Sequence, residues 1–187
     1  MANDRISHVF ALSRKRLDEA VAKSPKCSLS FSTTTSPPTR KSCSTGQGRR
    51  GLSVVQVDYT ITAANAFRET LVPLLPEGSH FRFVFCSGKL AEWDQTKTLH
   101  FMADTRHIKG QVEQRLCQVA DVDAAERFAV YCTRPSGILP ANAGLAARAL
   151  GKLYGAIDVD QLAKALIRVL LEGYKERIIE NGTLLTL

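Results

Sequence analysis

The sequence lacks any long hydrophobic run. No stretch of its 187 residues stays apolar over the roughly 20 positions that a membrane-spanning helix requires. Its opening residues, MANDRISHVFALSRKRLDE, also lack the apolar core of a secretory signal peptide. We therefore expect a soluble, cytoplasmic protein that has no membrane partner.

The sequence also lacks the cysteine patterns of metal sites and disulfide frameworks. No two of its five cysteines form a Cys-x-x-Cys pair, and none has a histidine at zinc-ligand spacing: Cys27, Cys43, Cys86, Cys117 and Cys132. The odd number and wide spacing favour reduced thiols, as in most cytosolic proteins. We expect no metal site, and we expect Cys86 and Cys132, near predicted strand ends, to be buried.

Acidic residues are scarce in the first quarter of the chain. Residues 1–52 contain ten Lys/Arg and three Asp/Glu, whereas residues 53–187 contain fifteen of each. The formal net charge of +7 therefore belongs to the N-terminal quarter alone. That quarter is nearly free of aromatic residues, which nucleic-acid-binding surfaces usually interleave with basic ones. We expect no nucleic-acid partner.

Residues 26–52 contain few apolar side chains and many Ser, Thr, Pro and Gly. Such a segment cannot offset the entropy lost on ordering, so we predict that it is flexible. This divides the chain into a remnant at 1–25, a flexible segment at 26–52 and a folded domain at 53–187. The glycine-rich string TGQGRRG at 45–51 lies within the flexible segment and does not follow a predicted strand, which argues against a phosphate-binding loop.

The first testable consequence is that limited proteolysis of the native chain should cut within residues 26–52 before it cuts elsewhere. Peptide mapping of the earliest fragments would check this. Protection of that segment, with earlier cleavage inside residues 53–187, would show that the division is wrong.

Residues 53–187 have the pattern of alternating helices and strands. Strands are predicted at 81–87 and 128–133, and a helix at 104–120 lies between them. Apolar residues at helical spacing predict the inner faces of three helices: Val57, Ile61, Ala64 and Leu71; Ile108, Val112, Leu116 and Val119; and Leu162, Leu166, Val169 and Leu170. One more strand is predicted at residues 8–12, and Asp158 is a candidate helix cap. The end of the chain, RIIENGTLLTL, is predicted to form a short extended tail. This alternation predicts an α/β fold with a parallel sheet and flanking helices.

Three polar positions should meet at one edge of that sheet. Ser87 and Arg134-Pro135 each follow a predicted strand, and Lys109 lies on the helix between the strands. In open parallel sheets ligands bind beyond the carboxyl ends of the strands. The alternatives are structural: Ser87 caps a strand, Lys109 is a solvated helix residue, and Arg134-Pro135 turns the chain. We interpret His80, His100 and His107 as loop or surface residues.

A strand ending in Ser-Gly, a helix with Lys-Gly-x-x-Glu (KGQVE, 109–113) and a strand ending in Arg-Pro-x-Gly (RPSG, 134–137) resemble the short-chain dehydrogenase/reductase family. The likeness is to its atypical branch, which includes fungal proteins and the human Tat-interacting oxidoreductase-like proteins. It covers residues 53–187 and, more weakly, 8–24, and it implies a Rossmann-like fold.

The resemblance implies an NAD(P)-dependent oxidoreductase that acts on a small carbonyl or hydroxyl compound, such as a polyketide of fungal secondary metabolism. It implies that Ser87 orients the substrate and that Lys109 binds the cofactor ribose. By the same likeness, Arg14 and Lys15 favour NADP, and Arg134 with Pro135 lines the nicotinamide pocket.

The sequence departs from this family in two respects. It has no glycine-rich turn after a first strand, so we expect an N-terminally incomplete Rossmann-like domain that binds NADP weakly. We interpret residues 26–52 as a product of altered splicing or of a shifted reading frame. The family's tyrosine, four residues before the lysine, is Thr105 here, and a threonine hydroxyl has no accessible pKa for acid–base work. The second hypothesis is therefore a truncated, non-catalytic relative that acts as an interaction or regulatory module.

Overall fold

The computed structural model describes residues 9–12, 27–30, 57–123 and 126–187. The chain divides into two compact units, Met1–Ser42 and Cys43–Leu187. In the first unit, β1 (Val9–Leu12) pairs in parallel with β2 (Cys27–Ser30). β1 coincides with the strand predicted at 8–12. β2 falls within the segment predicted to be flexible, and the rest of that segment lies outside the described residues, so its flexibility stays a prediction.

The second unit is built on a parallel sheet of three strands in the order β3-β4-β7. These are β3 (Phe81–Cys86), β4 (Phe128–Arg134) and β7 (Ile178–Glu180). Phe81 lies opposite Phe128, and Cys132 lies opposite Ile178. The predicted parallel pairing of 81–87 with 128–133 is confirmed. The third strand comes from the segment that the sequence predicted only as an extended tail.

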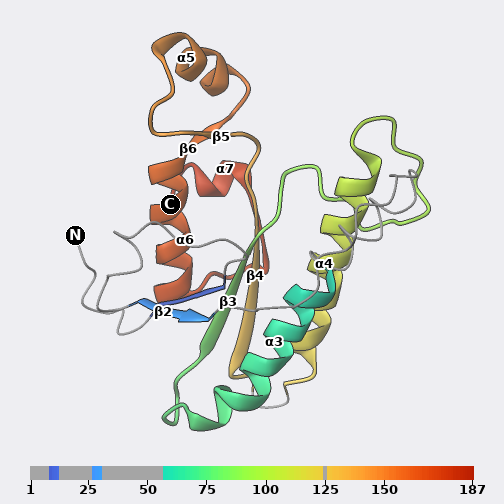
Figure 1. Ribbon diagram of the computed structural model, residues 1–187, viewed down its shortest axis with the longest axis vertical. Coiled ribbons are helices and arrows are strands. Elements are labelled where there is room, and N and C mark those ends of the chain that lie inside the picture. Colours follow the sequence, from blue (N-terminus) through green and yellow to red (C-terminus); the bar gives the residue numbers. More distant parts are fainter. Residues whose placement is uncertain (1–8, 13–26, 31–56, 124–125) are drawn as a thin grey trace, which may run out of the picture. The chain divides into compact units, whose positions relative to one another are not determined.

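Helices cover both faces of this sheet (Figure 1). On one face lie α3 (Tyr59–Thr70) and α4 (Ala103–Asp121), and on the other lies α6 (Val159–Glu172). All four residues of the predicted α4 stripe are buried, as are Val57, Ile61 and Ala64. α3 ends before the short 3-10 helix η2 (Val72–Leu74), which contains Pro73. The described residues thus form an α/β unit with a small parallel sheet.

The two cores differ in composition. The core beneath α3 and α4 contains stacked and tilted aromatic rings, contributed by Phe67, Phe81, Phe83 and Phe128. The core beneath α6 is mainly aliphatic and includes Leu162, Val169 and Ile179. Leu170 was predicted to lie on the inner face of α6, and this was wrong: it is 41% exposed. Asp158 occupies the cap position of α6, but its carboxylate pairs with Arg148 instead of capping the helix.

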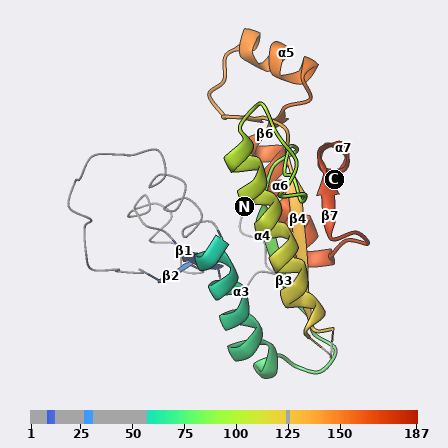
Figure 2. The same cartoon turned by 90° about the vertical axis from the view of Figure 1, so that its right-hand side faces the viewer.

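A smaller feature lies beyond the carboxyl end of β4 (Figures 1 and 2). Two short parallel strands, β5 (Ile138–Leu139) and β6 (Ile157–Asp158), flank α5 (Leu145–Leu153), and α7 (Asn181–Leu184) follows β7. α5 has no buried residue. In the part of the chain that is described, no helix combines the length and apolar character needed to cross a bilayer.

Candidate functional site

The carboxyl edge of the sheet brings Ser87 and Lys109 into contact. Ser87 follows β3 directly, and its backbone N–H donates to the Thr133 carbonyl of β4 at 2.8 Å. From α4, the Lys109 ammonium donates to the Ser87 carbonyl oxygen at 2.8 Å. The predicted juxtaposition of these two residues is therefore present, although the contact is with the backbone of Ser87 and not with its hydroxyl.

The Ser87 hydroxyl is buried and unsatisfied. Ser87 is 4% exposed, and its Oγ has no hydrogen-bond partner among the described residues. Most buried polar atoms in proteins have a partner, so an exception needs a reason, such as a ligand that supplies one. Together with the Lys109 ammonium, this hydroxyl is the polar feature of the edge best suited to meet a small molecule.

Arg134, at the end of β4, is engaged by carboxylates. Its Nε donates to Oε1 of Glu113 at 3.0 Å, and its Nη2 donates to Oε2 of Glu113 at 2.5 Å. Its Nη1 lies 3.0 Å from Glu180 Oε1. These contacts, led by the hydrogen bonds to Glu113, raise the pKa of Arg134 above its usual value. The resemblance implies that this guanidinium lines a nicotinamide pocket; in the structure it pairs with Glu113 and Glu180, and its place in such a pocket stays a prediction.

Glu113 is the centre of this network. It is fully buried, and besides Arg134 it accepts a hydrogen bond of 2.6 Å from the indole N–H of Trp93. Two donor groups thus satisfy one buried carboxylate. Sequence reasoning placed Glu113 in the KGQVE motif, found no paired carboxylate for it in Asp104, and missed both its role and Trp93. The signal was available in part, because Glu113 lies three residues before Leu116 and seven before Ala120, both buried, and so shares the inner face of α4.

A loop of residues 88–97, called here the edge loop, lies against α4. Its Glu92 N–H donates to the Arg106 carbonyl at 3.0 Å, and the Arg106 Nε donates to the Leu90 carbonyl at 2.8 Å. A side chain on Gly110 would place its Cβ 1.8 Å from the Glu92 carbonyl oxygen. Glycine after Lys109 is therefore required by the close approach of this loop, which explains the second residue of the KGQVE motif.

The remaining predicted residues are distributed as follows. The Pro135 carbonyl accepts a hydrogen bond from the Lys89 N–H at 3.0 Å, so this residue ties β4 to the edge loop. Thr105 lies half-buried on the first turn of α4. Arg14 and Lys15 lie outside the described residues, as does the glycine-rich string at 45–51.

Two predictions about burial were wrong. Cys86 is exposed at the end of β3, which pairs on one side only among the described strands. His107 was expected at the surface but is buried, and its Nε2 has no partner in the described part of the chain. Across that same part, no cluster of three or more His, Cys, Asp or Glu side chains could hold a metal ion.

Compared with known proteins, the chain matches no family model, no curated protein and no solved structure. The resemblance to short-chain dehydrogenases therefore stays a hypothesis that rests on the three motifs. The structure adds a physical relation between them: Ser87 contacts Lys109, Gly110 admits the edge loop, and Glu113 pairs with Arg134.

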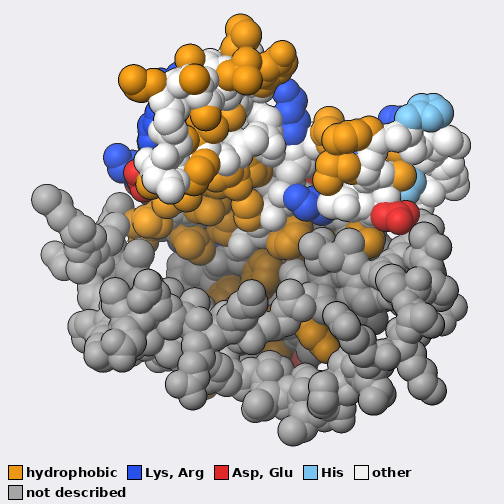
Figure 3. Space-filling model, turned by 45° about the horizontal axis from the view of Figure 1, so that its top comes forward, with side chains coloured by type: hydrophobic (Ala, Val, Ile, Leu, Met, Phe, Trp, Pro, Cys, Tyr) orange, Lys and Arg blue, Asp and Glu red, His pale blue; other side chains and the backbone are white. Residues whose placement is uncertain are grey.

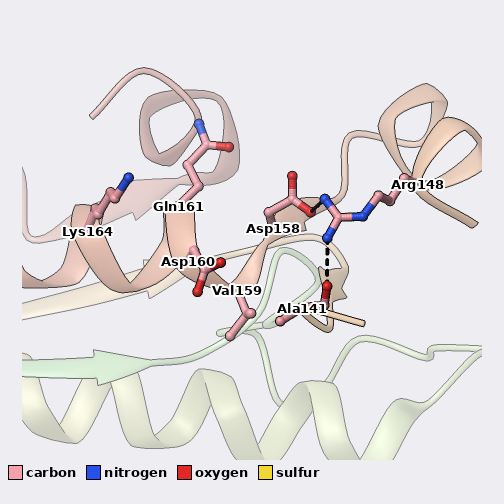
Figure 4. Close-up of a pocket in the computed structure, with 7 residues that line it drawn as sticks. All are labelled: Ala141, Arg148, Asp158, Val159, Asp160, Gln161 and Lys164. Carbon is pink, nitrogen blue, oxygen red and sulfur yellow. Dashed lines mark hydrogen bonds and ion pairs between the residues drawn. The ribbon is translucent and has the colours of Figure 1, made fainter. Parts of the chain in front are cut away.

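A pocket of about 370 Å³ lies elsewhere, at the start of α6 (Figure 4). Arg148 crosses it to reach the Asp158 carboxylate and the Ala141 carbonyl. None of the predicted site residues lines it. Because its one arginine is already paired, the pocket carries no separate functional assignment.

Proposed function

We propose that the chain is an NADP(H)-dependent oxidoreductase of the short-chain dehydrogenase type, acting on a small carbonyl or hydroxyl compound at the carboxyl edge of β3 and β4. The observation that supports this is the unsatisfied, buried Ser87 hydroxyl beside the Lys109 ammonium. Parallel α/β sheets bind ligands at this edge.

Each residue of the proposed site has a defined task. A nicotinamide nucleotide would supply the hydride. The Ser87 hydroxyl would donate a hydrogen bond to the substrate carbonyl oxygen, where negative charge develops on reduction. The Lys109 ammonium has donors beyond the one given to Ser87, because an ammonium carries three, and these would bind ribose hydroxyls. Since Thr105 cannot act as an acid near neutral pH, water would provide the proton.

The proposal predicts weak binding of the nucleotide by the 187 residues. The sequence has no glycine-rich turn, so the pyrophosphate lacks the backbone donors of a helix N-terminus. Each hydrogen bond to a charged group contributes about 1.5–3 kcal/mol, and losing two or three lowers affinity at least about a hundredfold. In a calorimetric titration with NADPH we expect a dissociation constant near the millimolar range, weakened roughly tenfold further by Lys109→Ala.

Lys97→Ala is the matched control, because Lys97 is an exposed lysine of the edge loop that pairs with Glu92. It should leave the affinity for NADPH unchanged. Tight binding that is lost on Lys109→Ala would overturn the expectation of weak binding and leave the enzyme assignment standing. If the native chain, Lys109→Ala and Lys97→Ala bind NADPH with equal affinity, Lys109 does not bind the nucleotide.

The second candidate is a non-catalytic relative that acts as an interaction module. Thr105 at the tyrosine position favours it, and so does the apolar surface of α5. Leu145, Leu153 and Tyr154 are each more than two-thirds exposed, and Figure 3 shows hydrophobic side chains gathered on this part of the surface. A chain that binds NADPH but reduces no member of a panel of small aldehydes and ketones would fit this candidate.

A further inference from the structure

Two cysteines come together between α4 and β4, where Cys132 lies opposite Phe85 of β3. Cys132 is fully buried in β4, within the core that α4 covers, and Cys117 lies half-buried on α4. Each thiol shifts the pKa of the other, so the two sulfur atoms lie within interaction distance. Their separation along the chain gave no reason to expect this contact, and Cys86 is exposed at the end of β3.

Arg177 holds this pair from the other side. Its carbonyl accepts the backbone N–H of Cys132 at 2.7 Å, and its guanidinium donates to the Asp121 carboxylate, four residues after Cys117 on the same helix. The charge of the guanidinium also acts on Cys117. Three elements, α4, β4 and the segment before β7, therefore fix the two sulfur atoms beside each other and beside one positive charge.

The environment makes the two thiols unequal. The hydrogen bond from Cys132, assisted by the charge of Arg177, lowers the pKa of Cys117 to about 7. The hydrogen bond to Cys117, together with burial, raises the pKa of Cys132. Burial opposes the ionisation of Cys117, and so do the charges of Asp121 and Glu113, but the net pKa is still lowered. Because the thiolate is the nucleophilic form, Cys117 is the thiol suited to attack an oxidant.

We propose that Cys117 and Cys132 form a reversible, peroxide-sensitive dithiol, in which Cys117 reacts first and Cys132 resolves it to a disulfide between α4 and β4. In the first step the Cys117 thiolate attacks one oxygen of hydrogen peroxide, the O–O bond breaks, and a sulfenic acid and hydroxide form. In the second step Cys132 sulfur attacks the Cys117 sulfur, releasing water. Two thiols and one peroxide thus give one disulfide and two waters. This proposal does not rest on the proposed oxidoreductase function.

The test uses the full chain, reduced and then freed of reductant. After treatment with hydrogen peroxide, remaining thiols are alkylated, and the tryptic peptides are analysed by mass spectrometry. Trypsin separates the two cysteines because Arg127 lies between them. We expect a cross-linked pair of peptides whose mass is lower by two hydrogen atoms than that of the two thiol peptides, and its disappearance on adding dithiothreitol.

Three variants sharpen the result. Cys132→Ala should leave Cys117 as a sulfenic acid that dimedone traps, whereas Cys117→Ser should abolish both the bridge and the trapped species. Cys86→Ser is the matched control and should leave the bridge unchanged. Circular dichroism of each variant checks that it is folded. A peroxide-treated native chain in which Cys117 pairs with Cys27 or Cys43, or in which Cys86 is oxidised first, would overturn the proposal.

A measurement without peroxide tests the assigned order of reaction. The rate at which iodoacetamide alkylates Cys117 should rise with pH and reach half its maximum near pH 7, because the thiolate fraction follows the pKa of about 7. In Cys132→Ala that midpoint should move upward toward the usual thiol pKa of about 8.5. If the pH midpoints of alkylation coincide in the native protein and Cys132→Ala, Cys132 does not lower the pKa of Cys117.

Discussion

Glu113→Ala is expected to lower the free energy of unfolding by about 3–5 kcal/mol, the usual cost of removing one partner from a buried ion pair. The carboxylate is fully buried, and it satisfies both the Arg134 guanidinium and the Trp93 indole. Alanine would leave these two donors without that acceptor in the interior of the protein. Urea unfolding, followed by circular dichroism, measures the change.

Two further variants decide whether the burial of the pair causes this loss. Glu176→Gln removes a carboxylate from an exposed pair with Lys175 and should cost no more than about 1 kcal/mol. Glu113→Leu combined with Arg134→Met replaces the buried pair by apolar side chains and should recover much of the stability lost by Glu113→Ala. If Glu113→Ala and Glu176→Gln lower the free energy of unfolding by the same amount, Glu113 does not hold the network together.

Gly110→Ala is expected to cost about 3 kcal/mol, at the upper end of the usual penalty for overpacking. The added Cβ would lie 1.8 Å from the Glu92 carbonyl oxygen and 2.3 Å from its carbon. These are backbone atoms, so no side-chain rotation relieves the clash, and the edge loop must move away from α4. Trp93, the single tryptophan of the chain, lies in that loop and reports its movement by fluorescence.

Gly182→Ala is the control for this substitution, because Gly182 also lies in a helix but its added Cβ would meet nothing within 4 Å. It should change the stability by less than about 1 kcal/mol, and in the stabilising direction, since alanine is the better helix former. A Gly110→Ala protein with native stability and unchanged tryptophan emission would show that the loop does not rest on α4 as described.

The features that the sequence predicted are those set by local periodicity. Every residue of the stripe from Ile108 to Val119 is buried because a helix of that spacing has one apolar face. The meeting of Ser87 and Lys109 was predictable because the helix that connects two parallel strands begins near the carboxyl end of the first strand, where Ser87 lies. β5 and β6 were missed because two residues are too few to show an alternating pattern.

The polar connections of the site could not be predicted in the same way. Glu113 contacts Trp93 and Arg134, and each lies at least 20 positions away, so no short-range rule links them. His107 occurs in a charged helical segment, which suggested exposure, but the edge loop packs on that segment and buries it. The contact between Cys117 and Cys132 depends in the same way on how α4 lies across the sheet.

The order of the strands has a consequence for how the protein behaves at high concentration. Among the residues described, β3 has a hydrogen-bonded neighbour only on its β4 side, and no described strand pairs with its other side. Its sequence, FRFVFC, combines three aromatic residues with a single charge, Arg82. Open strand edges of this composition promote association between copies and are usually blunted by charge. We expect concentrated solutions to aggregate through β3. Val84→Lys would not be a suitable way to add a second charge to this strand, because Val84 packs against the aliphatic core.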